Sequence, residues 1–310
     1  MDPRRKLPQG PSHDASIPGT IGPHHLHKSS PTTAVHDDDG DDDDLPGING
    51  GILVLAATTA NDYDLAQRKG TSMSRTAVIA GVGPGLGASL ARRLAAEGCT
   101  IGLLSRTMDF TEGLAAELSA QGSTTLAMAT DIADEAAVAT SFAQIRQQLG
   151  PVDVLVNHAS ASAWKGLLEV SAEEMERAWR VSVLGAFLCS REAARDMLAG
   201  DGGTILFTGA TSGVRGRAGA IDFSSAKFGM RGLADSMARE LWPQGIHVAH
   251  IIVDGMIDTA SLRQNYQLAE DEALLDPEDI AQVYWDLVTQ RRGAWSFEVD
   301  VRPHREAFFE

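Results

Sequence analysis

Cysteine is scarce in this sequence, and its scarcity argues against two classes of protein. Only two cysteines occur among 310 residues, Cys99 and Cys189, and they lie far apart within apolar segments. A disulfide framework needs several cysteines, and a metal-ligand cluster needs them at close spacing. We therefore predict neither a disulfide-stabilised fold nor a metal site, and a reducing compartment fits best.

Basic residues and long apolar runs are also few. The chain has 26 Lys and Arg against 42 Asp and Glu, for a formal net charge of −16, and such a surface repels nucleic acid and anionic lipid. No apolar run approaches the roughly 20 residues that cross a bilayer. The run at 51–60 is too short, and too far from the N-terminus, for a signal peptide. We expect a cytoplasmic protein with no nucleic-acid or membrane partner.

The first part of the chain, residues 1–72, has no helical periodicity. It is rich in Pro, Gly, Ser, His and Asp, with an acidic block at 37–44. Such a composition cannot offset the entropy lost on folding. Its histidines show no fixed ligand spacing, so they predict no metal site. We predict a disordered acidic extension over 1–72 and one folded domain over 73–310.

From residue 75 onward, short apolar runs alternate with helical patterns. Leu86, Leu90 and Leu94, for example, form one helical stripe. Most of the apolar runs are continuous, which is typical of parallel strands buried on both faces. Right-handed crossovers then give an α/β fold with a Rossmann-like, doubly wound parallel sheet of about seven strands and helices on both faces. The predicted strands are Thr76 to Ala80, Thr100 to Leu104, Thr124 to Met128, Val152 to Val156, Thr204 to Phe207, His247 to Val253 and Ala294 to Val299.

A glycine-rich turn joins the first strand to the Leu86 helix. Gly81, Gly85 and Gly87 allow a tight turn, a close approach of backbone to a pyrophosphate, and close packing of the helix on the strand. The helix N-terminus would face the phosphates. A glycine triplet alone is weak evidence, but its place between a strand and an amphipathic helix makes it strong.

This turn resembles the Thr-Gly-x-x-x-Gly-x-Gly pattern of the short-chain dehydrogenase/reductase family, with Ala80 in the threonine position. Two further segments agree: Asp131-Ile132 follows the third strand, and 157–160, Asn-His-Ala-Ser, is a variant of Asn-Asn-Ala-Gly. The resemblance covers roughly 75–302. It implies cofactor contacts from Gly81, Gly85, Leu86, Gly87, Ser105, Arg106, Asp131, Ile132, Asn157, Ala159 and Lys227.

The end of the second strand indicates which cofactor is used. It reads Leu104-Ser105-Arg106, with no carboxylate to hold the ribose 2′-hydroxyl of NAD(H). Arg106 would instead meet a 2′-phosphate with a forked donor, which favours NADP(H). The alternative is a solvated surface arginine.

The catalytic positions depart from the family pattern. Members use Tyr-x-x-x-Lys, in which the tyrosine gives a proton to the carbonyl and the lysine binds the nicotinamide ribose. Here Phe223 stands in the tyrosine position and Lys227 in the lysine position. Ala210 replaces the substrate-polarising serine, and Ser182 replaces an asparagine that orders a water molecule. Only Lys227 is retained, and the chain is most similar to a divergent subgroup with phenylalanine in the tyrosine position.

Few residues are candidates for a replacement acid. Tyr266 follows the sixth strand, although such a residue is more often a loop aromatic. His158 and Asp254 stand at strand ends and could titrate there, or they could satisfy backbone groups and cap a turn. Ser224 and Lys227 have a serine–lysine nucleophile spacing, which is better interpreted as ordinary helix sequence.

Two functions remain open at this point. The first is an NADP(H)-dependent oxidoreductase acting on a small carbonyl or alcohol substrate with a rearranged proton path. The second is a catalytically degenerate NADP(H)-binding pseudoenzyme with a regulatory or partner-binding role.

The family resemblance also implies a homodimer or homotetramer. Family members pair two long helices across a two-fold axis, and here these helices begin near Ser171, which forms a capping box with Glu174, and near Asp222. The apolar residues of these helices are too many to bury against one sheet face, although packing on the sheet is the alternative. They are Trp179, Phe187, Phe228 and Met237.

Overall fold

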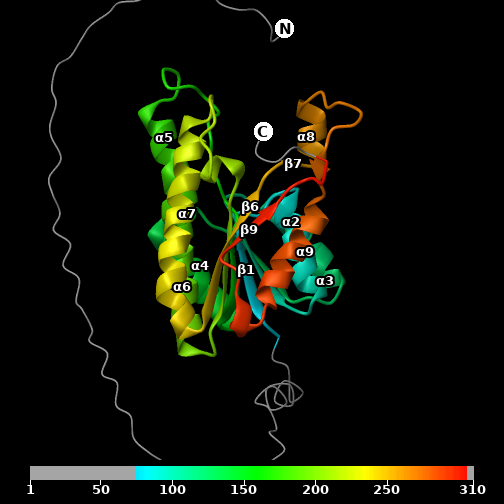
Figure 1. The fold of residues 1–310 in the computed structure, drawn as a ribbon. Helices are drawn as coiled ribbons and strands as arrows, with labels where there is room; N and C mark the ends of the chain where they lie inside the picture. The colour runs from blue at the N-terminus through cyan, green and yellow to red at the C-terminus, as the bar shows by residue number, and fades with distance from the viewer. Residues whose placement is uncertain (1–73, 306–310) are drawn as a thin grey trace, which may run out of the picture. The chain divides into compact units, whose positions relative to one another are not determined.

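A computed structural model describes residues 74–305. The predicted extension over 1–72 lies outside the described residues, and the division into extension and domain stays a prediction. The described chain forms a seven-stranded parallel sheet in the order β3-β2-β1-β4-β5-β6-β9 (Figure 1). This confirms the predicted doubly wound, Rossmann-like fold. The strands are β1 Thr76–Ala80, β2 Thr100–Ser105, β3 Thr125–Ala129, β4 Val152–Asn157, β5 Gly203–Thr208, β6 Ile246–Val253 and β9 Glu298–Val301.

Helices cover both faces of the sheet, because side chains alternate between the two faces along each strand. In β1, Ile79 packs into one core with Leu90 of α2, and Val78 packs into the other with Phe142 of α4. Figure 1 shows α2, α3 and α9 on one side and α4, α6 and α7 on the other. Their bounds are α2 Leu86–Ala96, α3 Thr111–Ala120, α4 Glu135–Gln148, α6 Gly185–Ala199, α7 Ile221–Leu241 and α9 Pro277–Val288.

The predicted capping box is confirmed at the start of α5 (Ala172–Trp179). The Ser171 hydroxyl accepts from the Glu174 amide at 3.2 Å, and the Glu174 carboxylate accepts from the Ser171 amide at 2.9 Å. The helix then passes through a π-helical turn, η1 (Arg180–Leu184), into α6. Two orphan backbone donors are thus satisfied at the start of one long helical unit.

The last strand was placed wrongly by the sequence pattern. That pattern predicts a strand from 294 to 299, whereas β9 begins at Glu298 and a short helix, η4 (Arg292–Ala294), precedes it. Trp295 is not a strand residue, because its indole stacks on His247 with ring centres 4.9 Å apart and donates to the Gln290 carbonyl. Trp295 is apolar because its side chain packs against His247. An apolar residue of this kind looks like part of a strand when only the sequence is considered. The other six predicted strands agree with the structure to within one residue at each end.

A short excursion between β6 and α9 was not predicted. It contains α8 (Ala260–Asn265) and a second sheet of two strands, β7 (Met256–Ile257) and β8 (Leu274–Leu275). Strands of two residues carry no periodicity that a sequence pattern can reveal. The excursion lies at the top of Figure 1, above the edge at which the strands of the main sheet end.

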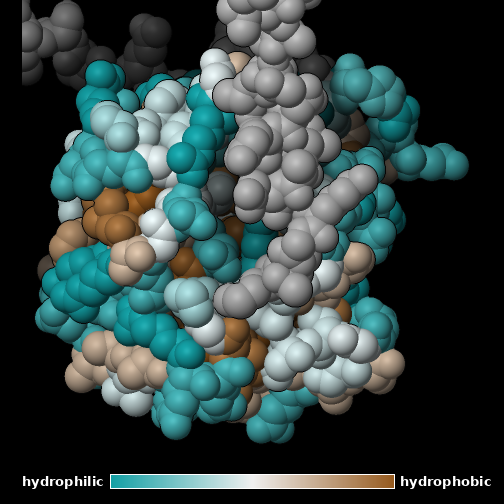
Figure 2. All heavy atoms as spheres, turned by 90° about the horizontal axis from the view of Figure 1, so that it is seen from below, coloured by the Kyte–Doolittle hydropathy of each residue, from teal (hydrophilic) through white to brown (hydrophobic). Residues whose placement is uncertain are grey.

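Parallel strands bring their carboxyl ends to one edge, so the loops after β1, β4 and β5 gather there. The register aligns Ala80 of β1 with Asn157 of β4, and Asn157 with Phe207 of β5. The view from below shows the opposite side, where hydrophilic side chains surround smaller hydrophobic patches (Figure 2). Among the helices of residues 74–305, none combines the length and apolar composition of a membrane span.

Candidate active site

The glycine-rich turn after β1 has the shape of a phosphate cradle. Gly81 has a φ of 101°, and a Cβ there would lie 2.5 Å from Ala159. Gly85 has a φ of 135°, and a Cβ there would lie 2.9 Å from the Thr259 methyl carbon. Both positions therefore require glycine. No side chain caps the first turn of α2, and the Ala88 amide donates to the Gly85 carbonyl, so the amides of Leu86 and Gly87 are left to an anion. The turn fits a dinucleotide diphosphate.

The loop after β2 is held by Ser105. Its hydroxyl donates to the Thr107 carbonyl at 2.5 Å and lies 3.1 Å from the Thr111 hydroxyl at the start of α3. Arg106 is the next residue and is exposed. Ser105 therefore shapes the turn from which Arg106 projects.

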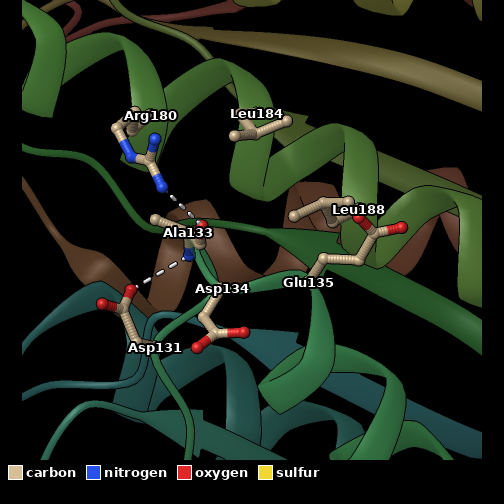
Figure 3. A pocket seen from close by; sticks show the side chains of 7 residues that line it. All are labelled: Asp131, Ala133, Asp134, Glu135, Arg180, Leu184 and Leu188. Carbon is tan, nitrogen blue, oxygen red and sulfur yellow. Dashed lines mark hydrogen bonds between the residues drawn. The ribbon is translucent and has the colours of Figure 1, made fainter.

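The loop after β3 contains Asp131 and Ile132, two of the predicted cofactor contacts. The Asp131 carboxylate accepts from the Ala133 amide at 3.0 Å, and Ile132 is buried against α6, where a Cβ on Gly185 would lie 2.7 Å from it. A hollow of about 450 Å³ lies between this loop and the η1–α6 unit, and the Arg180 guanidinium donates across it to the Ala133 carbonyl at 3.3 Å (Figure 3). The hollow is lined by Asp131, Ala133, Asp134, Glu135, Arg180, Leu184 and Leu188.

The end of β4 is fixed to the glycine-rich turn. The amides of His158 and Ala159 both donate to the Ala80 carbonyl, at 3.0 and 2.8 Å. The buried Asn157 amide group instead donates to Ser190 of α6 at 2.9 Å. Asn157 therefore joins the sheet to α6, and Ala159 stands against the cradle.

Lys227 and Phe223 lie on α7, as the family motif requires. The Lys227 ammonium is buried and donates to the Thr208 carbonyl at 2.7 Å, and it lies 5.4 Å from the centre of the Phe223 ring. Burial lowers the pKa of Lys227 to about 8. Phe223 also packs against Trp164, with ring centres 4.8 Å apart. An aromatic pair thus occupies the position that the sequence predicts for the family's tyrosine.

Ala210 and Ser182, the other two positions that differ from the family pattern, lie on different elements. Ala210 is half-buried and begins a short helix, η2 (Thr211–Gly213), directly after β5. Ser182 lies in the π-helical turn and is wholly buried, and its hydroxyl has no hydrogen-bond partner within residues 74–305. Ala210 therefore lies at the carboxyl edge of the sheet, whereas the Ser182 hydroxyl is buried.

The candidate replacement acids have different surroundings. Tyr266 ends α8 with 64% of its surface exposed. Asp254 forms an ion pair with Arg302 at 2.7 Å and accepts a hydrogen bond from the Thr211 hydroxyl. The Ser224 hydroxyl accepts from the Arg217 amide at 3.2 Å, in keeping with an ordinary helix residue.

His158 is the candidate closest to the cradle. Its Nδ1 lies 3.1 Å from the Thr208 hydroxyl, which in turn lies 2.7 Å from the Tyr284 hydroxyl of α9. Burial of the imidazole, together with the charge of Lys227, lowers the pKa of His158 to about 4. His158 is therefore neutral near pH 7.

Several site residues were not found from the sequence. Thr208 lies two residues before Ala210 in the chain, but no local signal connects it to Tyr284 on α9 or to His158. Trp164 has a φ of 53°, the one non-glycine residue with positive φ among those described, and nothing in its local sequence indicates the stack on Phe223. Across residues 74–305, no three His, Cys, Asp or Glu side chains are grouped so as to hold a metal ion.

Comparison with known proteins agrees with this geometry. The family model described as short chain dehydrogenase matches residues 75–270, so the chain belongs to the short-chain dehydrogenase family, and the predicted family is confirmed. The phenylalanine subgroup stays a prediction. The chain is 30% identical over 191 residues to the 3-oxoacyl-[acyl-carrier-protein] reductase MabA of Mycobacterium tuberculosis. The aligned region covers 62% of this chain and 72% of MabA.

Solved structures show the same fold. A short-chain dehydrogenase from Rhodopseudomonas palustris has 34% identity and a TM-score of 0.65, over 74% of this chain and 99% of its own. A metagenomic short-chain oxidoreductase solved in complex with NADP has 27% identity and a TM-score of 0.65, over 75% of this chain and 99% of its own. The described domain is therefore of the oxidoreductase class.

Proposed function

We propose that this chain is an NADP(H)-dependent oxidoreductase that interconverts a carbonyl and an alcohol without the family's tyrosine. The observation that supports the proposal most directly is the environment of Lys227, the residue at the family's lysine position. Its ammonium is buried and held on Thr208 at the carboxyl edge of the sheet. A buried charge is costly to maintain, and its place at this edge favours a functional role.

The cofactor would be held by groups already in place. Gly81 and Gly85 leave room for the diphosphate, and the uncapped N-terminus of α2 offers its amide groups. Arg106 is exposed at the end of β2 and presents a forked donor suited to a 2′-phosphate. The metagenomic relative was solved with NADP, which supports this choice. When bound, the cofactor supplies or accepts the hydride.

The adenine end and the ribose have their own candidate contacts. Asp131 and Ile132, which follow β3, would contact the adenine end, and Lys227 would bind the nicotinamide ribose. The Lys227 ammonium has three protons and donates one of them to the Thr208 carbonyl. The other two remain for ribose hydroxyls or for a substrate.

Proton transfer needs a group other than Phe223 or Ala210, because neither side chain carries a transferable proton. Lys227, with its pKa lowered to about 8, holds a proton near neutral pH and releases it readily. It would give this proton to the carbonyl oxygen during reduction and take it back during oxidation. Burial of the ammonium is what keeps its pKa low.

The same helices would form a subunit interface. Trp179 of α5, Phe187 of α6 and Phe228 of α7 are exposed, whereas Met237 packs partly against the core. Figure 1 shows α5, α6 and α7 on one side of the sheet. Three large apolar side chains left open there support a homodimer or homotetramer.

Single-turnover hydride transfer tests the proposal. Deuterium-labelled NADPH is mixed with the protein and a broad panel of carbonyl compounds, and label in the alcohol product is measured. The parent should transfer label, and Lys227→Ala should transfer little. If the parent binds NADPH but labels no carbonyl, the oxidoreductase proposal fails and the nucleotide-binding pseudoenzyme takes its place.

A further inference from the structure

A buried chain of hydroxyl groups ends at His158. The Tyr284 hydroxyl lies 2.7 Å from the Thr208 hydroxyl, which lies 3.1 Å from Nδ1 of His158. Tyr284 is wholly buried and Thr208 nearly so, whereas His158 is only partly buried. These hydrogen bonds therefore run from Tyr284 in the core to His158 beside the glycine-rich turn.

Counting protons fixes the direction of these hydrogen bonds. The phenol of Tyr284 has one proton, and leaving it unpaired in the core would be costly. Its acceptor is the Thr208 oxygen, so the Thr208 proton goes to the other neighbour, Nδ1 of His158. Nδ1 then carries a lone pair, and the neutral imidazole bears its proton on Nε2.

The Nε2 edge of the ring lies against the glycine-rich turn. A Cβ built on Gly87, in the first turn of α2, would lie 3.4 Å from Cδ2 of His158. Cδ2 is bonded to Nε2, so both atoms lie at this edge of the ring. The backbone of His158 is held on Ala80, which fixes the ring relative to the glycine-rich turn. The imidazole is thus held beside the first turn of α2.

We propose that His158 donates its Nε2 proton to the diphosphate of the dinucleotide at the N-terminus of α2, and that Thr208 and Tyr284 are positioning residues which hold the required tautomer. This inference rests on the proposed function, because it requires that the chain bind a dinucleotide. A neutral donor suits the place, because the positive end of α2 and the Lys227 ammonium already provide positive charge. His158 would therefore contribute a directed hydrogen bond rather than a charge.

The binding test separates the two ends of the cofactor. ADP-ribose contains the diphosphate, whereas adenosine 2′-monophosphate does not. His158→Phe keeps a ring but removes the donor, and it should weaken ADP-ribose binding about tenfold by calorimetry while leaving adenosine 2′-monophosphate binding unchanged. His158→Gln, whose amide can donate from a similar position, should recover part of the loss.

A matched control and a second measurement complete the test. His247 is a buried histidine whose ring faces the carbonyls of Leu287 and Ser296, and His247→Phe should change binding of neither ligand. In the unmutated protein, nitrogen-15 chemical shifts should place the His158 proton on Nε2. The double variant Thr208→Val with Tyr284→Phe removes both hydroxyls together, and it should give a tautomer mixture and ADP-ribose binding weakened severalfold.

The outcomes are distinct. Unchanged ADP-ribose binding by His158→Phe, an equal loss for both ligands, or a proton on Nδ1 in the parent would each overturn the role of His158. Absence of dinucleotide binding by the parent would overturn the proposed function, and this inference with it. Hydride transfer by a protein whose His158→Phe variant binds ADP-ribose normally would leave the proposed function standing alone.

Discussion

The Lys227 ammonium lies 5.4 Å from the centre of the Phe223 ring, one helical turn away on α7. In the family pattern this pair is a tyrosine and a lysine, and the lysine charge assists the tyrosine. Here the ring has no hydroxyl, and the ammonium donates to the Thr208 carbonyl. The motif therefore predicts a retained lysine without the hydroxyl that it assists in the family pattern.

The Lys227 charge should lower stability near neutral pH. Its folded pKa of about 8 lies below the ordinary value of 10.5, so the unfolded chain binds more protons between these values, and stability rises as pH increases from about 8 to 10.5. Lys227→Met should therefore stabilise the protein at pH 7, by on the order of 3 kcal/mol, and by less at pH 9.5. Thermal unfolding at the two pH values measures this.

A suitable control for that comparison is Lys165→Met. Lys165 is more exposed than Lys227 and pairs with Glu174 at 2.6 Å, so its replacement should give no stabilisation at pH 7. A gain for Lys227→Met that is equal at both pH values would contradict the role of the buried charge.

NADPH should bind about tenfold more tightly than NADH, because the Arg106 guanidinium can pair with the 2′-phosphate. Arg106→Ala should abolish the preference, as measured by fluorescence titration. Arg93→Ala is the control, since Arg93 is paired with Glu97 on α2 at 3.3 Å and should not affect the preference. Equal affinities of the parent for both cofactors would rule out NADP(H) selectivity.

Restoring the family's groups should raise turnover. Phe223→Tyr places a phenol beside the Lys227 ammonium, which lowers the phenol pKa, and Ala210→Ser adds a donor for the carbonyl oxygen. The double variant should reduce carbonyl compounds at least 10-fold faster than the parent, since a positioned acid contributes roughly 10²–10⁴-fold. Steady-state NADPH oxidation measures the change. Normal NADPH binding with no faster reduction would mean that the site serves another reaction or none.

A charge on the exposed face of α7 should disrupt the oligomer. Phe228 is exposed, and Phe228→Glu would bury a carboxylate at the proposed interface. Sedimentation velocity at micromolar concentration should show a parent of at least two subunits and a monomeric variant. Tyr266→Glu, at an exposed position on another element, should leave the mass unchanged. A monomeric parent would refute the interface.

Removal of residues 1–72 should leave the melting temperature and NADPH binding unchanged. All seven strands of the main sheet, and the helices that cover them, lie within residues 74–305. Calorimetry of the shortened and full chains provides the comparison. A melting temperature lower by several degrees in the shortened chain would show that the segment contributes to the core.

Local patterns were sufficient for most of the architecture. Buried parallel strands are apolar runs, and Leu86, Leu90 and Leu94 repeat at helical spacing, so the sequence alone locates six strands and the first helix. The positions of Phe223 and Lys227 followed from a motif within one helix. Such features depend on residues close together in the chain, where backbone geometry alone links sequence to structure.

Tertiary structure decided the contacts between distant segments. Thr208 and Tyr284 are 76 positions apart and meet at 2.7 Å, because β5 and α9 pack in the same core. Trp164 reaches Phe223 of α7 from the loop after β4, and Trp295 packs on His247 instead of continuing a strand. The chain by itself determined the fold and the glycine-rich turn, and it predicts the loss of the tyrosine. The surroundings of Lys227 and His158 were decided only by packing, because a pKa or a tautomer depends on neighbours that sequence spacing does not specify.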